Sequence, residues 1–245
     1  INSNDEDHLN YNVMRAMFAH WSNGVIKDPH GLGGPGQCIA RNNKDYNDTL
    51  DWTRAIGRGI ALNRTSYFYN KTIWNQDGET DWQDLRHNRE VGNWVEMEDL
   101  RYNNKNSDFY GKHYQLYATE DYVKDGKVVV KKGDILCGDT IRSWYPTPLY
   151  QLYILDEVNE ANLGANQFQG ASGKGCNGDV YLFRLADTYL LRAEARFYKG
   201  DVTGAAQDVN AVRARANAKK MYTTVTIGDI ADERARELYL EEWRQ

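Results

Sequence analysis

The sequence lacks a long apolar run and lacks a basic block. No window approaches the roughly 18 consecutive apolar residues that a membrane-spanning helix needs. The net charge is −5, and binding to nucleic-acid phosphates requires concentrated positive charge. These two absences argue against a transmembrane protein and against nucleic acid as a partner.

Cysteine is scarce, and histidine is scattered. Cys38, Cys137 and Cys176 are far apart and form no C-x-x-C pair, which argues against a disulfide-dense scaffold and a zinc site. One disulfide with one free thiol stays possible. The five histidines form no H-x-H or H-x-x-x-H pair, so neither zinc nor triad chemistry is indicated. We expect no cofactor and no metal.

Two further motifs are incomplete. Gly31, Gly33 and Gly36 fit G-x-G-x-x-G, but Pro35 interrupts the motif and no helical pattern follows, so we interpret it as a loop rather than a nucleotide site. Asp77, Glu79 and Asp81 offer alternating carboxylates, yet their spacing is not that of an EF-hand. A solvated acidic turn is favoured over a calcium site.

Aromatic side chains are abundant in a chain whose mean hydropathy is −0.76. The sequence has 7 Trp, 17 Tyr and 6 Phe, and a hydrophilic protein with so many rings is expected to expose some of them. Exposed rings stack on the C–H faces of sugars, whereas buried rings only fill a core. Both interpretations are open for each ring.

The candidate ligand-binding residues lie in the polar first hundred residues. Trp74 and Trp82 flank a turn rich in glycine and acidic residues, and are the pair least expected to be both buried; the alternative is that one of them anchors the loop to the core. Polar neighbours would bond sugar hydroxyls. The candidate set is Trp74, Trp82, Trp52, Trp94, Tyr67, Tyr69, Asn75, Asp81 and Arg86.

The local patterns predict a small β-hairpin and a run of helices toward the C-terminal end of the sequence. Residues 64–74 favour an extended segment because β-branched and aromatic residues dominate, and residues 75–94 are expected to be mostly loop. Asp125-Gly126 predicts a hairpin turn within residues 121–136. We expect a loop-rich ligand-binding region over residues 1–179 and a helical region over residues 180–245.

The helical region is expected to begin with a hairpin of two helices. Gly200 should end the first helix and Asp201 should cap the second. Ala205 and Val209 approximate the A-x-x-x-F element of a tetratricopeptide repeat. The predicted faces are Tyr181, Leu182, Leu185, Tyr189, Ala193 and Phe197 in the first helix, and Val202, Ala205, Val209 and Val212 in the second.

A third helix is predicted from Asp229 to Trp243. Arg234, Glu237, Glu241 and Arg244 share one of its faces and can form ion pairs. A salt-bridge network that fixes helix packing is favoured over a binding or catalytic carboxylate site. The same interpretation applies to Arg192 and Glu194.

Two stretches of this region resemble the RagB/SusD family. The first is RLADTYLLRAEA at Arg184–Ala195, followed by Lys199-Gly200-Asp201 and by NAVRARA at 210–216. The second is the spacing of Glu233, Arg234, Glu237, Leu238, Glu241 and Arg244. Weaker similarities are DLRHN at 84–88 and YPTP at 145–148.

The resemblance implies a mainly helical fold, with tetratricopeptide-like helix pairs packed with a large irregular loop-rich region. It also implies a non-catalytic, lipid-anchored protein at the outer face of the outer membrane, which captures glycans and passes them to a SusC-like TonB-dependent transporter. The first residue is not Met, and a helical pattern is still running at Gln245. We therefore expect an internal piece of a longer protein, without its anchor.

Three functions remain open from the sequence. The first is surface glycan binding by aromatic stacking, and the second is peptide binding by a member of the same family. The third is a helical glycoside hydrolase, which would need two carboxylates about 5–9 Å apart. No motif in the sequence singles out two such acids.

Overall fold

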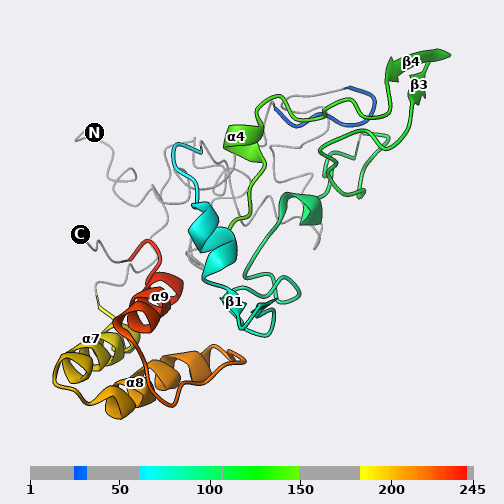
Figure 1. The fold of residues 1–245 in the computed structure, drawn as a ribbon. Coiled ribbons are helices and arrows are strands. Elements are labelled where there is room, and N and C mark those ends of the chain that lie inside the picture. The colour runs from blue at the N-terminus through cyan, green and yellow to red at the C-terminus, as the bar shows by residue number, and fades with distance from the viewer. Residues whose placement is uncertain (1–24, 32–60, 106, 149–182, 242–245) are drawn as a thin grey trace, which may run out of the picture. The chain divides into compact units, whose positions relative to one another are not determined.

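The computed structural model describes residues 25–31, 61–105, 107–148 and 183–241 (Figure 1). Their regular elements are mostly helices, with two small two-stranded sheets. None of the helices in these ranges is long and apolar enough to cross a membrane. Trp52, one of the candidate ligand-binding residues, lies outside them.

The chain divides into two units by its internal contacts. We call the first the irregular unit; it comprises Ile1–Arg64 and Val95–Gly178. We call the second the helical unit; it comprises Thr65–Trp94 and Asp179–Gln245. The segment 65–94 thus packs with the C-terminal helices, far from it in sequence.

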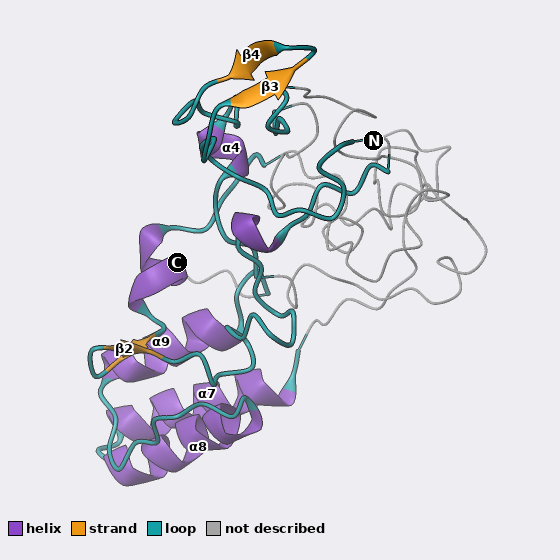
Figure 2. Ribbon diagram, turned by 90° about the vertical axis from the view of Figure 1, so that its right-hand side faces the viewer, coloured by secondary structure: helices purple, strands orange, loops and turns teal. Residues whose placement is uncertain are grey.

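The helical unit contains an antiparallel hairpin of α7 (Leu185–Tyr198) and α8 (Val202–Arg215) (Figures 1 and 2). Gly200 has a φ of +83°, which permits its amide and that of Asp201 to bond back to the last turn of α7. The Asp201 carboxylate accepts the amide of Gly204 at 2.8 Å. The predicted stop and cap are both confirmed.

Small side chains bring the two helices together. Ala193 and Ala205 are fully buried, and Leu190 and Val209 pack beside them. The predicted face of α8 is confirmed at Ala205, Val209 and Val212, while Val202 is half-buried. The predicted face of α7 is wrong at Leu185, which is 70% exposed; Ala186 and Leu190 are buried instead.

The third helix, α9 (Ile227–Glu237), packs against α7 and α8. Thr226 and Asp229 form a reciprocal capping box at its start. The helix was expected to reach Trp243, but it ends at Glu237, and Leu240 has a φ of +66°. Glu241 therefore lies beyond the end of α9, although its spacing from Glu237 is that of a helix.

The segment 65–94 begins with a short π-helical turn, η2 (Phe68–Thr72). The prediction of an extended segment at 64–74 is wrong, because Tyr69 and Ile73, four residues apart, are both buried against α9 residues and Tyr239. A tight hairpin follows, of β1 (Asn75–Gln76) and β2 (Glu79–Thr80). The rest is loop, as predicted.

The irregular unit contains a hairpin and little other regular structure in its described residues. Strands β3 (Tyr122–Lys124) and β4 (Lys127–Val130) are joined at Asp125-Gly126, both with positive φ, which confirms the predicted turn. The short helices are η3 (Met97–Asp99) and α4 (Thr140–Ser143). Isolated antiparallel bridges connect the loops, as between Val95 and Thr147.

The core of the irregular unit is made of large side chains. Tyr102, Phe109 and Tyr114 contact one another and pack with Met97 and Leu100. Irregular backbone around them is bonded locally, as where the Tyr102 hydroxyl donates to the carbonyl of Lys27 at 3.0 Å. Large side chains fill this core without a regular arrangement of helices or strands.

Candidate ligand-binding site and the charged network beside it

The predicted aromatic site residues divide into exposed and buried rings. Tyr67 is 78% exposed and Trp82 is 46% exposed. Trp74 and Trp94 are buried, at 1% and 0% exposure, and Tyr69 is buried beside them. The expectation that Trp74 and Trp82 are not both buried is met, and Trp74 is the ring that anchors the segment to the core.

The predicted polar site residues also have structural partners. Asn75 is exposed, and its side-chain oxygen accepts the Gly78 amide at 2.9 Å, which closes the β1–β2 turn. Asp81 is buried and accepts the amides of Gln83, Asp84 and Lys219. Arg86 is buried among carboxylates.

An aromatic stack consists of Trp82, His87 and Trp74. The centroid of the His87 ring lies 4.7 Å from that of Trp82 at 19° and 4.7 Å from that of Trp74 at 13°. Two nearly parallel rings at this distance must cover opposite faces of the imidazole, because one face has room for only one. Trp94 contacts the same imidazole at 4.4 Å, tilted by 58°.

His87 is enclosed by these rings and stays uncharged at neutral pH. Burial, together with the nearby positive charges of Lys71 and Arg89, lowers its pKa from 6.5 to about 3. Neither of its ring nitrogens has a hydrogen-bond partner among the described residues. The imidazole therefore packs here as an uncharged, flat ring.

The acidic turn at 77–81 pairs with two lysines. The Asp77 carboxylate lies 2.8 Å from Lys220 Nζ, and the Glu79 carboxylate lies 3.1 Å from Lys219 Nζ. Within the part of the chain that the structure describes, no three His, Cys, Asp or Glu side chains gather as a metal site. The two ion pairs support the interpretation of Asp77 and Glu79 as parts of a solvated acidic turn.

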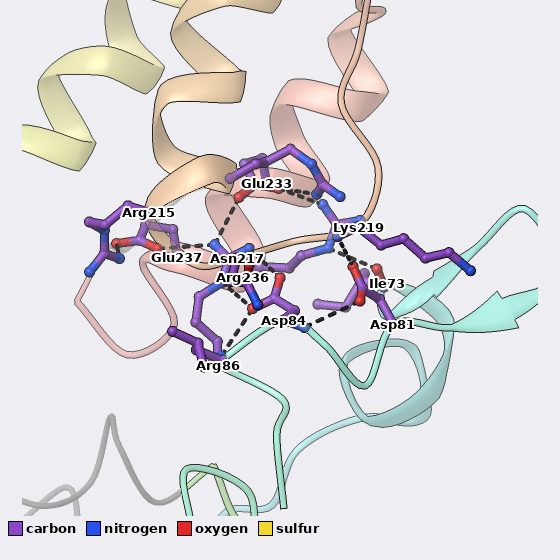
Figure 3. A network of polar contacts seen from close by, with 12 residues as sticks. Ile73, Asp81, Asp84, Arg86, Arg215, Asn217, Lys219, Glu233, Arg236 and Glu237 are labelled. Carbon is purple, nitrogen blue, oxygen red and sulfur yellow. Dashed lines mark hydrogen bonds and ion pairs between the residues drawn. The ribbon is translucent and has the colours of Figure 1, made fainter. Parts of the chain in front are cut away.

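A buried arginine–carboxylate network joins the segment 65–94 to the helices (Figure 3). Arg86 forms a fork with Asp84, with nitrogen–oxygen distances of 2.9 and 2.6 Å. Its remaining nitrogen donates to Glu233 at 2.8 Å and to Glu237 at 3.0 Å. One guanidinium thus bonds three carboxylates from two distant stretches of sequence.

Glu233 is the most enclosed carboxylate of this network. It accepts hydrogen bonds from Arg86 through one oxygen, and from Arg213 at 2.7 Å and Arg236 at 2.8 Å through the other. Burial alone would raise its pKa, but Arg86, Arg236 and Arg213 together outweigh that effect and lower the pKa to about 2. The carboxylate stays ionised and cannot act as a general acid near neutral pH.

Glu237 extends the network toward the start of α7. Its carboxylate is bonded by Arg86, by Arg215 and by Arg184 at 2.6 Å. Arg184 also donates to the Glu237 carbonyl and to the carboxylate of Glu241. The sequence motif that contains Arg184 thus meets the motif that contains Glu237 and Glu241.

A second charged cluster holds α7 to α8. Arg192 bonds both oxygens of the buried Asp208, and Arg196 bonds the same carboxylate at 3.0 Å. On the other side of α7, Asp187 accepts from Arg234 of α9 at 3.1 Å. These contacts favour the packing interpretation of the charged faces over a catalytic one.

The sequence reasoning did not assign a role to Asp84 or His87. The signal was present, since DLRHN at 84–88 is one of the weaker family similarities and contains Asp84, Arg86 and His87. Composition suggested Arg86 as a hydroxyl-binding group, yet its carboxylate partner Glu233 lies 147 residues further along the chain. Only the folded chain reveals that pairing.

Comparisons with known proteins identify the family of the chain. The sequence model of the SusD family matches residues 34–245, so the chain belongs to the SusD family. A stretch of 64 residues, 26% of the chain, is 53% identical to the starch-binding protein SusD of Bacteroides thetaiotaomicron. The match covers 11% of the length of that relative.

Proposed function

We propose that this chain is part of a surface nutrient-binding protein that captures glycans without chemical turnover. The observation that carries the proposal is the match to the SusD family over residues 34–245. The similarity to a starch-binding protein supports a carbohydrate ligand. Capture then requires aromatic stacking and hydroxyl hydrogen bonds, and no catalytic group.

The described residues contain exposed rings and enclosed acids. Tyr67 and Trp82 present ring surface to solvent, whereas Glu233 and Glu237 are covered by arginines. A glycosidase needs one acid that holds a proton near neutral pH, and a carboxylate whose pKa is about 2 does not. Glu233 is therefore excluded as the acid of a glycosidase. Among the predicted site residues, Tyr67 and Trp82 are the ones we retain for ligand stacking.

The remaining parts of the proposal rest on family membership. The protein is lipid-anchored at the outer face of the outer membrane and passes its glycan to a SusC-like TonB-dependent transporter. The α7–α8 hairpin, with its alanine-lined crossing, is one tetratricopeptide-like unit of a larger helical array. The buried charged network keeps this scaffold in place while the ligand contacts lie elsewhere.

A binding screen of the full-length protein tests the function. Calorimetric titration with plant, host and microbial oligosaccharides, maltoheptaose among them, is expected to give saturable binding to at least one. Mass spectrometry of the purified protein separates the peptide alternative, because a tightly held peptide would copurify. Flat titrations throughout, or measurable turnover of any glycan, would contradict the proposal.

A further inference from the structure

Trp82 is the exposed end of an aromatic stack whose other rings are buried. Its inner face lies on His87, at 4.7 Å and 19°, and His87 in turn lies on Trp74. Trp82 is nevertheless 46% exposed. Since one face of the indole is covered by the imidazole, the exposed surface belongs to its outer face and its edge.

The backbone that carries Trp82 is fixed on both sides. The Trp82 carbonyl accepts the side-chain amide of Asn88 at 2.8 Å, and its own amide donates to the Thr80 carbonyl at 3.1 Å. The preceding residue, Asp81, is buried and bonds the amides of Gln83, Asp84 and Lys219. A ring held in this way loses little conformational freedom when a ligand covers it.

The ring of His87 supports Trp82 through its flat faces rather than through its nitrogens. Both of its ring nitrogens lack a hydrogen-bond partner among the described residues, although burying unpaired polar atoms is costly. Its contacts are with the faces of Trp82 and Trp74 and with Trp94. What the position uses is the flat five-membered ring, which sets the plane and the depth of the exposed indole.

We infer that the outer face of Trp82 is a stacking platform for one pyranose ring of a neutral glycan, and that His87 is the positioning residue of this platform. The inference rests on the proposed function and names a site for it. A flat, exposed, rigidly supported indole is complementary to the axial C–H face of a pyranose.

Ring-removing and ring-keeping variants of the full-length protein test the platform. The probes are maltoheptaose, cellohexaose, xylohexaose and mannohexaose, each titrated by calorimetry and by tryptophan emission. Trp82→Ala is expected to weaken binding of the best probe at least tenfold, with only a small decrease in melting temperature. Trp82→Phe, which keeps a flat ring, is expected to lose less affinity.

Two variants at His87 test whether its flat ring positions Trp82 or only fills space. His87→Phe keeps a flat ring between the two indoles, and His87→Leu keeps apolar volume without one. We expect affinity and the ligand-induced emission change to persist in His87→Phe and to fall several-fold in His87→Leu, with both measured well below the melting temperatures.

The outcomes separate the platform from the proposed function. Equal affinity of wild type and Trp82→Ala for a probe that binds would overturn the platform and leave glycan capture standing. Equal affinity of His87→Phe and His87→Leu would overturn the positioning role. No binding of any glycan to wild type would contradict the proposed function itself and the platform with it.

Discussion

The core of the helical unit differs in composition from the core of the irregular unit. The helical unit buries alanines and valines where its helices cross, buries Tyr69, Trp74 and Trp94 in the segment 65–94, and joins its segments through arginine–carboxylate pairs. The irregular unit packs tyrosine, phenylalanine and methionine around loops. Among the buried charged side chains of the described residues, Asp28 alone belongs to the irregular unit.

This difference explains where the sequence is most recognisable. A crossing lined by Ala193 and Ala205 tolerates no larger side chain, and Arg86 between three carboxylates tolerates no other residue. An aromatic loop core accepts other residues of similar volume. Most of the family similarities seen in the sequence fall in the helical unit, at Arg184–Ala195, in the charged run that begins in α9 and at DLRHN; the weaker one at YPTP (145–148) falls in the irregular unit.

The largest effect is expected from breaking the charged network. Glu233→Gln leaves Arg86, Arg213 and Arg236 without their shared charge, and we expect the free energy of unfolding to fall by about 3–5 kcal/mol. Urea denaturation measures it. The control is Glu79→Gln, which removes an exposed pair with Lys219 and should cost less than about 1 kcal/mol. Similar losses from both variants would refute a special role for the network.

The aromatic stack gives the next comparison within the helical unit. Trp74→Ala removes a buried ring and should destabilise the protein by about 3–5 kcal/mol. Trp82→Ala removes an exposed ring of the same stack, and its cost should be well below that. Thermal unfolding of both variants checks the ranking. The reverse order would mean that Trp82 and not Trp74 is the anchor.

Acid should weaken the helical unit through His87 before it affects Glu233. Because the folded-state pKa of His87 is about 3 and the unfolded value is 6.5, the unfolded chain takes up the proton first and stability falls as the pH drops below 6.5. At pH 5 the loss is about 2 kcal/mol. The pKa of Glu233 is lowered from 4.5 to about 2, so its contribution is present above pH 4.5 and is lost below it.

Unfolding at pH 7 and pH 5 measures this dependence, and His87→Phe is the control. The variant keeps the stack but carries no titrating ring, so it should lose about 2 kcal/mol less than wild type between these two pH values. An identical pH dependence in both proteins would show that His87 is not the responsible group.

The smallest effect is expected in the irregular unit. Met97→Leu conserves volume in an aromatic-rich core and should cost less than about 1.5 kcal/mol. Ala205→Leu adds volume at the α7–α8 crossing and should cost about 1–3 kcal/mol or more. Denaturation midpoints compare the two. A greater loss from Met97→Leu would contradict the proposed difference between the two cores.

Features fixed by a few neighbouring residues could be predicted from the sequence. Gly200, Asp201 and the Asp125-Gly126 turn follow from backbone conformation alone and are confirmed. The segment 64–74 could not be predicted, because burial of Tyr69 and Ile73 in the helical unit overrides its β propensity. Trp74 and Trp82 are the same residue type on either side of one turn, so the sequence does not show which is buried; the packing of the folded chain does.

The most direct measurement is a crystal structure of the full-length protein with the oligosaccharide that binds best in the titrations. We predict one pyranose ring parallel to the outer face of Trp82, with its carbons about 4 Å from the indole, and His87 still stacked beneath it. A bound glycan at another place, with the outer face of Trp82 left in solvent, would contradict the account.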